Sequence, residues 1–172
     1  MPIPHLTKAQ MTDLKAICQI IADAKARLKK AGSPQWQTGY PNENSIQNDI
    51  INHHGWVLRA NHEVAGYVAI IPGEEPTYGA IDGAWIKPND PYITLHRVAI
   101  SEHYLGQGFS KYLFSNAITI GLSQGIHNFR VDTYHLNQAM QTIAKQAGFE
   151  YRGIIKVNEP VHPERLGFEL NL

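Results

Sequence analysis

The sequence contains one cysteine and no long apolar run. Cys18 cannot form an internal disulfide, which favours a reducing compartment. It stands at helical spacing with Leu14, Ile17 and Ile21, a pattern that indicates a small buried hydrophobe rather than a nucleophile. No apolar stretch approaches the roughly 20 residues of a membrane span, and the first ten residues lack the basic and apolar regions of a signal peptide. We therefore expect a cytoplasmic protein with no membrane partner.

The sequence also lacks an excess of charge of either sign. Fifteen lysines and arginines balance fifteen aspartates and glutamates, so the basic surface typical of nucleic-acid binding is missing and we expect no nucleic-acid partner. The adjacent His53 and His54 cannot face one metal ion from a helix, and no ligand set has metal spacing, so we expect no metal site. No repeat or linker divides the chain, which predicts a single domain over residues 1–172.

Helical and strand patterns together predict a mixed α+β sheet. The predicted helices cover residues 11–30, 43–53, 108–123 and 137–147, and the predicted strands cover 56–60, 64–71, 92–100, 128–134, 149–157 and 166–172. The first two strands form a plausible antiparallel hairpin. The strands at 92–100 and 128–134 flank a helix, which predicts a right-handed crossover with parallel strands. Residues 72–91 are rich in glycine, proline and charge and are predicted to form a long loop.

A pair of glycines joins the predicted strand 92–100 to the helix after it. The first amides of a helix have no partner within it, and together with the helix dipole they attract an anion. Glycine permits the positive φ angles that turn consecutive N–H groups toward one point. We interpret this backbone as a cradle for a diphosphate, with a tight turn that binds nothing as the alternative. The residues of the cradle are Gly106, Gln107, Gly108, Phe109, Ser110 and Lys111, the last of which adds a nearby positive charge.

Two other nucleotide-binding motifs fit this stretch poorly. A P-loop needs Gly-Lys-Ser/Thr, whereas Gly108 is followed by Phe109 and Ser110. A dinucleotide-binding motif needs a third glycine, but Lys111 stands at that position. The motif also needs an acidic residue near the end of the following strand, and only this requirement is met, by Asp132.

The stretch LGQGFS, from Leu105 to Ser110, resembles the central motif Arg/Gln-x-x-Gly-x-Gly/Ala of the GNAT superfamily of acetyl-CoA-dependent N-acetyltransferases. The strand end RVAIS, Asn137 and the AGF at 147–149 fit the same pattern, so the likeness covers residues 92–150. It implies acetyl-CoA as the cofactor and a largely antiparallel central sheet flanked by helices on both faces. Two positions depart from the motif, because Leu105 replaces its Arg/Gln and Ser110 its final Gly/Ala.

The resemblance also implies roles for single residues. Backbone groups of Val98, Ala99 and Ile100 would hold the pantetheine arm and the acetyl carbonyl, and Asn137 would contact the pantetheine region. An N–H group at Val98 would stabilise the oxyanion that develops during attack. The family often carries a tyrosine seven residues after this asparagine as the general acid. Ala144 occupies that position, so the proton must come from elsewhere or from water.

His96 is the first candidate for the general base, because an attacking amine must be neutral. Strand alternation places residues 94, 96, 98 and 100 on one face, so His96 would point into the cleft. A histidine that is hydrogen-bonded between sheet and helix is the alternative. Tyr134 and His135, just beyond the next strand, are other proton carriers.

Aromatic residues in or beside the loops are candidates for a substrate pocket: Trp36, Tyr40, Trp85 and Tyr92. Covering the core is the alternative for each of them. Glu74, Glu75 and Asp82 place carboxylates where they could attract a cationic amine, with a solvated loop as the alternative.

We thus expect acetyl transfer to a primary amine of a small molecule, peptide or protein, by direct attack in a ternary complex. A non-catalytic acyl-CoA-binding sensor or interaction module with the same fold is the alternative. Apolar end strands and exposed aromatics are compatible with a homodimer.

Overall fold

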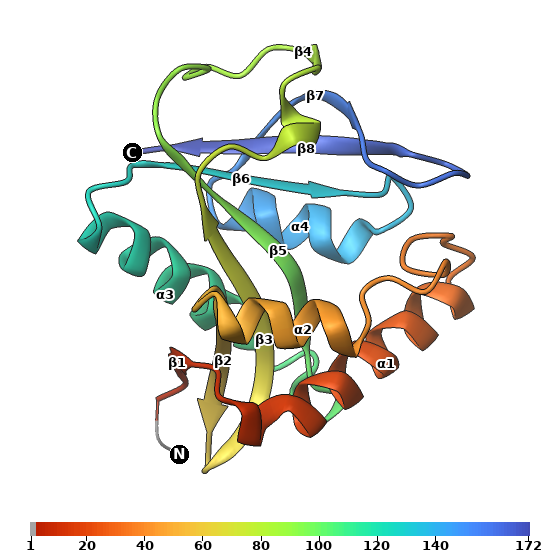
Figure 1. The fold of residues 1–172 in the computed structure, drawn as a ribbon, viewed down its shortest axis with the longest axis vertical. Coiled ribbons are helices and arrows are strands. Elements are labelled where there is room, and N and C mark those ends of the chain that lie inside the picture. The colour runs from red at the N-terminus through yellow and green to blue at the C-terminus, as the bar shows by residue number, and fades with distance from the viewer. Residues whose placement is uncertain (1–2) are drawn as a thin grey trace.

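The computed structural model describes residues 3–172, which form one eight-stranded sheet with helices packed on it (Figure 1). The strands are β1 (His5–Lys8), β2 (Gly55–Ala60), β3 (Glu63–Pro72), β4 (Asp82–Gly83), β5 (Tyr92–Ile100), β6 (Asn128–Thr133), β7 (Glu150–Lys156) and β8 (Glu164–Asn171). The α-helices are α1 (Leu14–Lys30), α2 (Glu43–Ile51), α3 (Phe109–Ser123) and α4 (Gln138–Gln146). The strand order is β1-β2-β3-β5-β6-β8-β7-β4, with β5 and β6 as the one parallel pair among the described strands. The expected mixed, largely antiparallel sheet is confirmed.

Both edge strands of the sheet were missing from the sequence-based expectation. β1 pairs with β2, and β4 pairs with β7, so each lies at one end of the strand order. β1 has four residues and β4 only two, which is too short for a period-2 pattern to stand out. The predicted loop 72–91 therefore contains β4 and a short 3₁₀ helix, Pro76–Tyr78.

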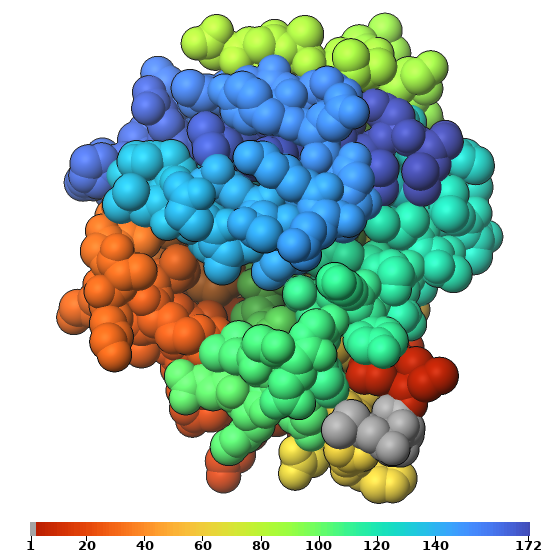
Figure 2. All heavy atoms as spheres, turned by 180° about the vertical axis from the view of Figure 1, so that it is seen from behind, coloured from red at the N-terminus to blue at the C-terminus, as the bar shows by residue number. Residues whose placement is uncertain are grey.

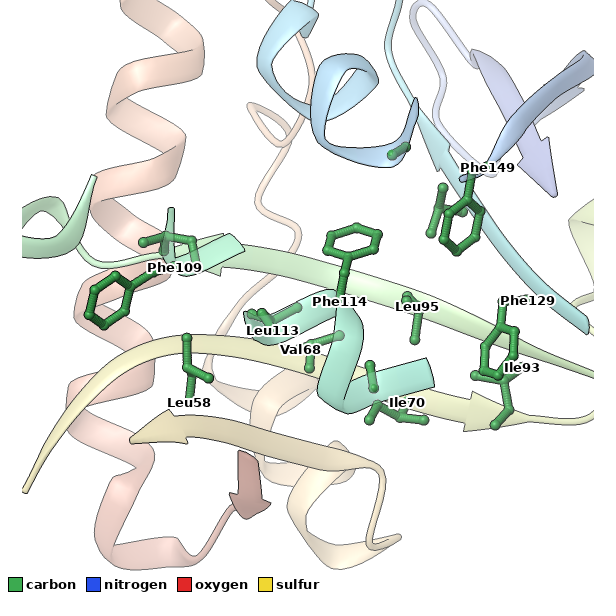
Figure 3. Close-up of a cluster of buried hydrophobic side chains, with 14 of the residues drawn as sticks. Leu58, Val68, Ile70, Ile93, Leu95, Phe109, Leu113, Phe114, Phe129 and Phe149 are labelled. Carbon is green, nitrogen blue, oxygen red and sulfur yellow. The ribbon is translucent and has the colours of Figure 1, made fainter. Parts of the chain in front are cut away.

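The helices cover both faces of the sheet, as expected (Figures 1 and 2). On one face, α1 and α2 place a row of isoleucines against Val57, Tyr67 and Ala99. On the other face, α3 and α4 build the larger core, in which Leu113 and Phe114 meet strand residues such as Val68 and Leu95 (Figure 3). Each helix is long enough for one apolar face to be buried on the sheet. Within residues 3–172, no helix combines the length and the apolar character needed to cross a membrane.

The parallel pair β5 and β6 separates part-way along its length. The two strands are in register only at Tyr92↔Asn128, Ile93↔Phe129 and Thr94↔Arg130. β5 then continues to Ile100 beside β3, and β6 continues to Thr133 beside β8. Because each strand follows a different neighbour beyond Thr94, the sheet opens between them (Figure 1).

A β-bulge lies in β5 just after this opening. Arg97 has a φ of 54°, in the left-handed region that residues with a β-carbon rarely adopt. The register with β3 passes from Ala69↔His96 to Tyr67↔Ala99, so Arg97 and Val98 together stand opposite Val68. Nothing in the sequence marked this bulge, because no glycine occupies the position with positive φ.

The bulge changes which side chains share a face of β5. Val98 and Ile100 pack with Leu95 in the core under α3, whereas Ala99 packs with the cluster under α1. The expectation that His96, Val98 and Ile100 share one face is therefore wrong. The extra residue shifts the alternation by one position.

Candidate active site

A cavity of about 930 Å³ lies where β5 and β6 separate. Its walls come from β5, from the end of β6, from the first turns of α4, and from the segment that joins α1 to α2. Figure 2 shows the hollow between this connecting segment in orange, α4 in blue and the green segment that leads into α3. The lining residues on β5 run from Leu95 to Ile100, and Asp132 and Thr133 line the cavity from β6. The divergence of the two strands thus creates the site.

The turn before α3 presents a row of free backbone donors. Among the described residues, none accepts a hydrogen bond from the five N–H groups of Gly106 to Ser110. Gly106 and Gly108 have φ angles of 72° and 78°, as the sequence predicted for a turn that gathers N–H groups. Leu105 and Ser110, on either side of these glycines, line the cavity.

This turn fits a diphosphate in both space and charge. Nothing lies within 4 Å of where a β-carbon would stand on Gly106 or Gly108, so an anion can approach the main chain. The 15-residue helix α3 directs the positive end of its dipole at the same point. Phe109 contributes its backbone alone, since its side chain is buried against Tyr104. Lys111 is exposed and lies outside the cavity lining.

His96 is held by a carboxylate that strand patterns could not reveal. Its Nε2 lies 3.1 Å from Oε2 of Glu75, and both residues line the cavity. Oε1 of Glu75 accepts hydrogen bonds from the backbone N–H of Thr77 (3.2 Å) and from its hydroxyl (2.9 Å). The hydrogen bond from His96, and then those from Thr77, lower the pKa of Glu75 to about 2 against the opposing effect of burial.

Because Glu75 is ionised at neutral pH it can only accept, so Nε2 of His96 carries the proton in this bond. Nδ1 of neutral His96 is then left as an acceptor. Glu75 is therefore a partner of His96 and not a solvated loop residue.

A second network joins the bulge to helix α2 and to the α1–α2 connection. Arg97 donates from Nε and Nη2 to the two oxygens of Asp49, at 2.7 and 2.5 Å, and both side chains are nearly buried. Tyr67 also donates its hydroxyl proton to Asp49, at 2.6 Å. The remaining arm of Arg97, Nη1, donates to the hydroxyl oxygen of Tyr40 at 2.5 Å. The residue with the unusual φ is thus fixed by a buried carboxylate.

Of the other predicted site residues, Trp36, Tyr40 and Asn137 line the cavity together with Val98, Ala99 and Ile100. The side chain of Asn137 caps α4 by accepting from the N–H of Met140, at 3.1 Å.

Among the residues predicted for catalysis or for substrate binding, Tyr134 and Trp85 lie away from the cavity lining. Tyr134 is 6% exposed and packs against His135. Trp85 is 8% exposed, donates from Nε1 to the carbonyl of Tyr78, and lies over the guanidinium of Arg130. Trp85 therefore covers the core, which was the alternative to a role in the substrate pocket. Ala144 is fully buried in the core and brings no hydroxyl to the site.

Two further polar residues of the cavity were not singled out from the sequence as site residues. Gln35 is buried, and its Oε1 accepts long hydrogen bonds from the N–H of Tyr134 (3.4 Å) and from Nδ2 of Asn137 (3.5 Å). Asp132 accepts from the hydroxyl of Tyr78 at 2.7 Å. Neither has a local sequence signal, because their partners come from distant segments.

The model of the acetyltransferase (GNAT) family matches residues 21–149. The chain belongs to this family. A solved acetyltransferase of the GNAT family from Streptococcus agalactiae is 34% identical, with a TM-score of 0.88, over 98% of this chain and 95% of that one. The resemblance that the LGQGFS stretch suggested is therefore confirmed, and the family is one of acyltransferases.

Two relatives that are named as N-acetyltransferases agree with this assignment. The chain is 27% identical to N-acetyltransferase 8F1 of Rattus norvegicus over 63% of its own length and 45% of the rat protein, so it spans less than half of that relative. It is 25% identical to the uncharacterized N-acetyltransferase YesJ of Bacillus subtilis over 82% of this chain and 78% of that protein.

Proposed function

We propose that this protein transfers an acetyl group from acetyl-CoA to a primary amine of a small molecule, peptide or protein, by direct attack within a ternary complex. The observation that carries the proposal is the continuous cavity between β5 and β6. Its lining includes Leu105 and Ser110, which flank the free N–H groups, and His96, which Glu75 holds. One cavity can thus hold an acyl donor beside an amine, as direct transfer requires.

In this proposal the main chain does most of the cofactor binding. Acetyl-CoA supplies an activated acyl group, and the protein has to position it. The N–H groups from Gly106 to Ser110 hold the diphosphate, with Lys111 as an additional charge. Backbone groups of β5 at Val98, Ala99 and Ile100 hold the pantetheine arm, together with Asn137.

Val98 is the proposed oxyanion donor. Its backbone lies in the bulge, outside the register of β3, and lines the cavity. A fixed N–H group in such a position stabilises negative charge as it develops on the acetyl oxygen.

His96 is the proposed general base. Glu75 keeps the proton on Nε2 of His96, so Nδ1 is the atom that accepts a proton from the amine. Trp36 and Tyr40 form part of the acceptor wall. Tyr134 becomes a weaker candidate for proton transfer, since its side chain does not line the cavity.

The release of free thiol from acetyl-CoA in the presence of a broad panel of amines tests the proposal. We expect release above background with at least one primary amine. Tight binding of acetyl-CoA without release for any amine would instead support the non-catalytic acyl-CoA-binding module. That second function is favoured by one observation, the buried Ala144 at the position where the family often has an acid.

Replacement of His96 tests the role of the base. We expect His96→Ala to lower kcat/KM by about 100-fold at neutral pH and to remove the acidic limb of the pH profile. His127→Ala is the control, because His127 is exposed and lies outside the cavity lining. An unchanged profile in His96→Ala would remove His96 from the mechanism.

The acceptor amine, a cytoplasmic location and a homodimer are parts of the proposal that rest on the sequence. The charge balance likewise favours a substrate other than nucleic acid.

A further inference from the structure

Tyr40 is the one tyrosine among the described residues that line the cavity, and this lining contains no cysteine or lysine. The proposed transfer releases a thiolate, which leaves more readily if a proton reaches the sulfur as the bond breaks. A neutral hydroxyl of moderate acidity can supply that proton at neutral pH, and a serine or threonine hydroxyl is far less acidic. Tyr40 is therefore the hydroxyl of the cavity best suited to this step.

The orientation of Tyr40 supports this role. Its oxygen accepts a hydrogen bond of 2.5 Å from Nη1 of Arg97, and no described residue accepts the proton of its own hydroxyl. Arg97 is itself fixed, because its other two donor atoms bind both oxygens of the buried Asp49. The oxygen of Tyr40 is thus held beside a permanent positive charge while its proton has no protein partner.

The position of Arg97 in the chain places this pair beside the proposed reaction centre. Arg97 directly precedes Val98, and the two residues form the bulge of β5. The donor proposed for the acetyl oxygen and the cation that holds Tyr40 are therefore adjacent residues of one β-bulge. Ala144, buried in the core on α4, cannot contribute a proton to the same place.

We propose that Tyr40 is the catalytic residue that protonates the departing sulfur, and that Arg97 is its positioning residue. This inference rests on the proposed acetyl transfer. Tyr40 donates its hydroxyl proton to sulfur as the carbon–sulfur bond breaks with its electron pair remaining on sulfur, which yields a free thiol. The resulting phenolate accepts the hydrogen bond from Arg97. It regains a proton from the His96 imidazolium, directly or through water, and His96 had taken that proton from the amine, so protons balance over the cycle.

The protonation state of Tyr40 agrees with this assignment. Tyr40 is 40% exposed as a whole, and partial burial of its hydroxyl raises the pKa of that group, while the charge and hydrogen bond of Arg97 act against that rise and Asp49 and Asp132 add to it. Tyr40 therefore carries its proton at neutral pH, and Arg97 limits the cost of losing it transiently.

A binding experiment tests the contact between Tyr40 and sulfur without catalysis. Calorimetry measures the affinities of the wild type and of Tyr40→Phe for two ligands. These are coenzyme A and its desulfo analogue, in which hydrogen replaces the thiol. The preference is the affinity for coenzyme A divided by the affinity for the desulfo analogue. We expect this ratio to be about threefold or more smaller in Tyr40→Phe than in the wild type, because the variant loses a hydrogen bond to sulfur. Tyr151→Phe is the control, since Tyr151 is 51% exposed and lies outside the cavity lining.

Kinetics supply the second readout. Tyr40→Phe should lower kcat by about 100-fold with every amine that the wild type accepts, with unchanged affinity for acetyl-CoA. An identical preference for coenzyme A in the wild type and the variant, or a change confined to the KM of one amine, would overturn the role of Tyr40 and leave acetyl transfer intact. Failure of the wild type to bind acetyl-CoA would instead overturn the proposed function itself.

Discussion

Two regions of the cavity are built in opposite ways. The main-chain region, residues 105–111, is one contiguous stretch that offers backbone N–H groups and almost no side-chain chemistry. The side-chain region consists of His96 with Glu75 and of Arg97 with Asp49 and Tyr40. Glu75 is 21 residues from His96 in the sequence, whereas Asp49 and Tyr40 are 48 and 57 residues from Arg97. The first region should therefore be sensitive to a β-carbon on a glycine and tolerant of other changes. The second should be sensitive to the loss of a single polar group.

The largest expected effect concerns the Arg97–Asp49 pair. Asp49→Ala would leave the guanidinium of Arg97 buried without its carboxylate, and removal of one partner of such a pair costs about 3–5 kcal/mol. We expect a loss of this size in the free energy of unfolding, measured by urea titration.

Glu102→Ala is the matched control for this experiment. Oε1 of Glu102 lies 3.4 Å from Nη1 of Arg27, and the Glu102 side chain is 57% exposed. We therefore expect Glu102→Ala to lower the free energy of unfolding by only about 0–1 kcal/mol. A similar small loss in Asp49→Ala would mean that the side-chain region contributes little to the fold.

The next effect is the pH dependence of stability due to Glu75. Its pKa is about 2 in the folded protein against 4.5 in the reference state. A depressed pKa stabilises the fold above pH 4.5, and this contribution is lost as the pH falls from 4.5 toward 2. We expect the free energy of unfolding to fall by about 1–2 kcal/mol more in the wild type than in Glu75→Gln over this interval. Equal slopes for the two proteins would show that His96 and Glu75 do not interact in solution.

A side-chain change in the main-chain region should have a smaller effect. Leu105→Arg restores the basic residue of the family motif next to the free N–H groups, and one exposed charge adds about 0.2–1 kcal/mol to binding. We expect the affinity for acetyl-CoA to rise by about twofold to fivefold in calorimetry. Leu122→Arg, at the far end of α3, is the control. An increase well above tenfold would indicate that side-chain charge dominates this region.

The contrast between the regions also explains what the sequence could predict. The glycines at 106 and 108 carry a local signal, because a positive φ and a helix start need no knowledge of the rest of the fold. The parallel pair and the crossover follow from element order, and these were predicted within a few residues.

The side-chain region could not be predicted in the same way. Glu75 lies in a segment that looks like a solvated loop, and only the folded chain brings it to His96. The bulge at Arg97 has no glycine to mark it, so the alternation of β5 was misjudged beyond His96. Trp85 was grouped with pocket aromatics because it lies in a loop, although its ring packs over Arg130.

Binding of acetyl-CoA by main-chain donors is tested most directly by calorimetry on Gly108→Val and Gly125→Val. The two glycines have φ angles of 78° and 77°, both lie in open space, and they flank opposite ends of α3. Each substitution carries a similar backbone strain of about 1–2 kcal/mol, so only the ligand distinguishes them. We predict that Gly108→Val weakens acetyl-CoA binding by at least about tenfold and that Gly125→Val leaves it unchanged. Equal affinities in both variants would contradict a diphosphate site at the start of α3.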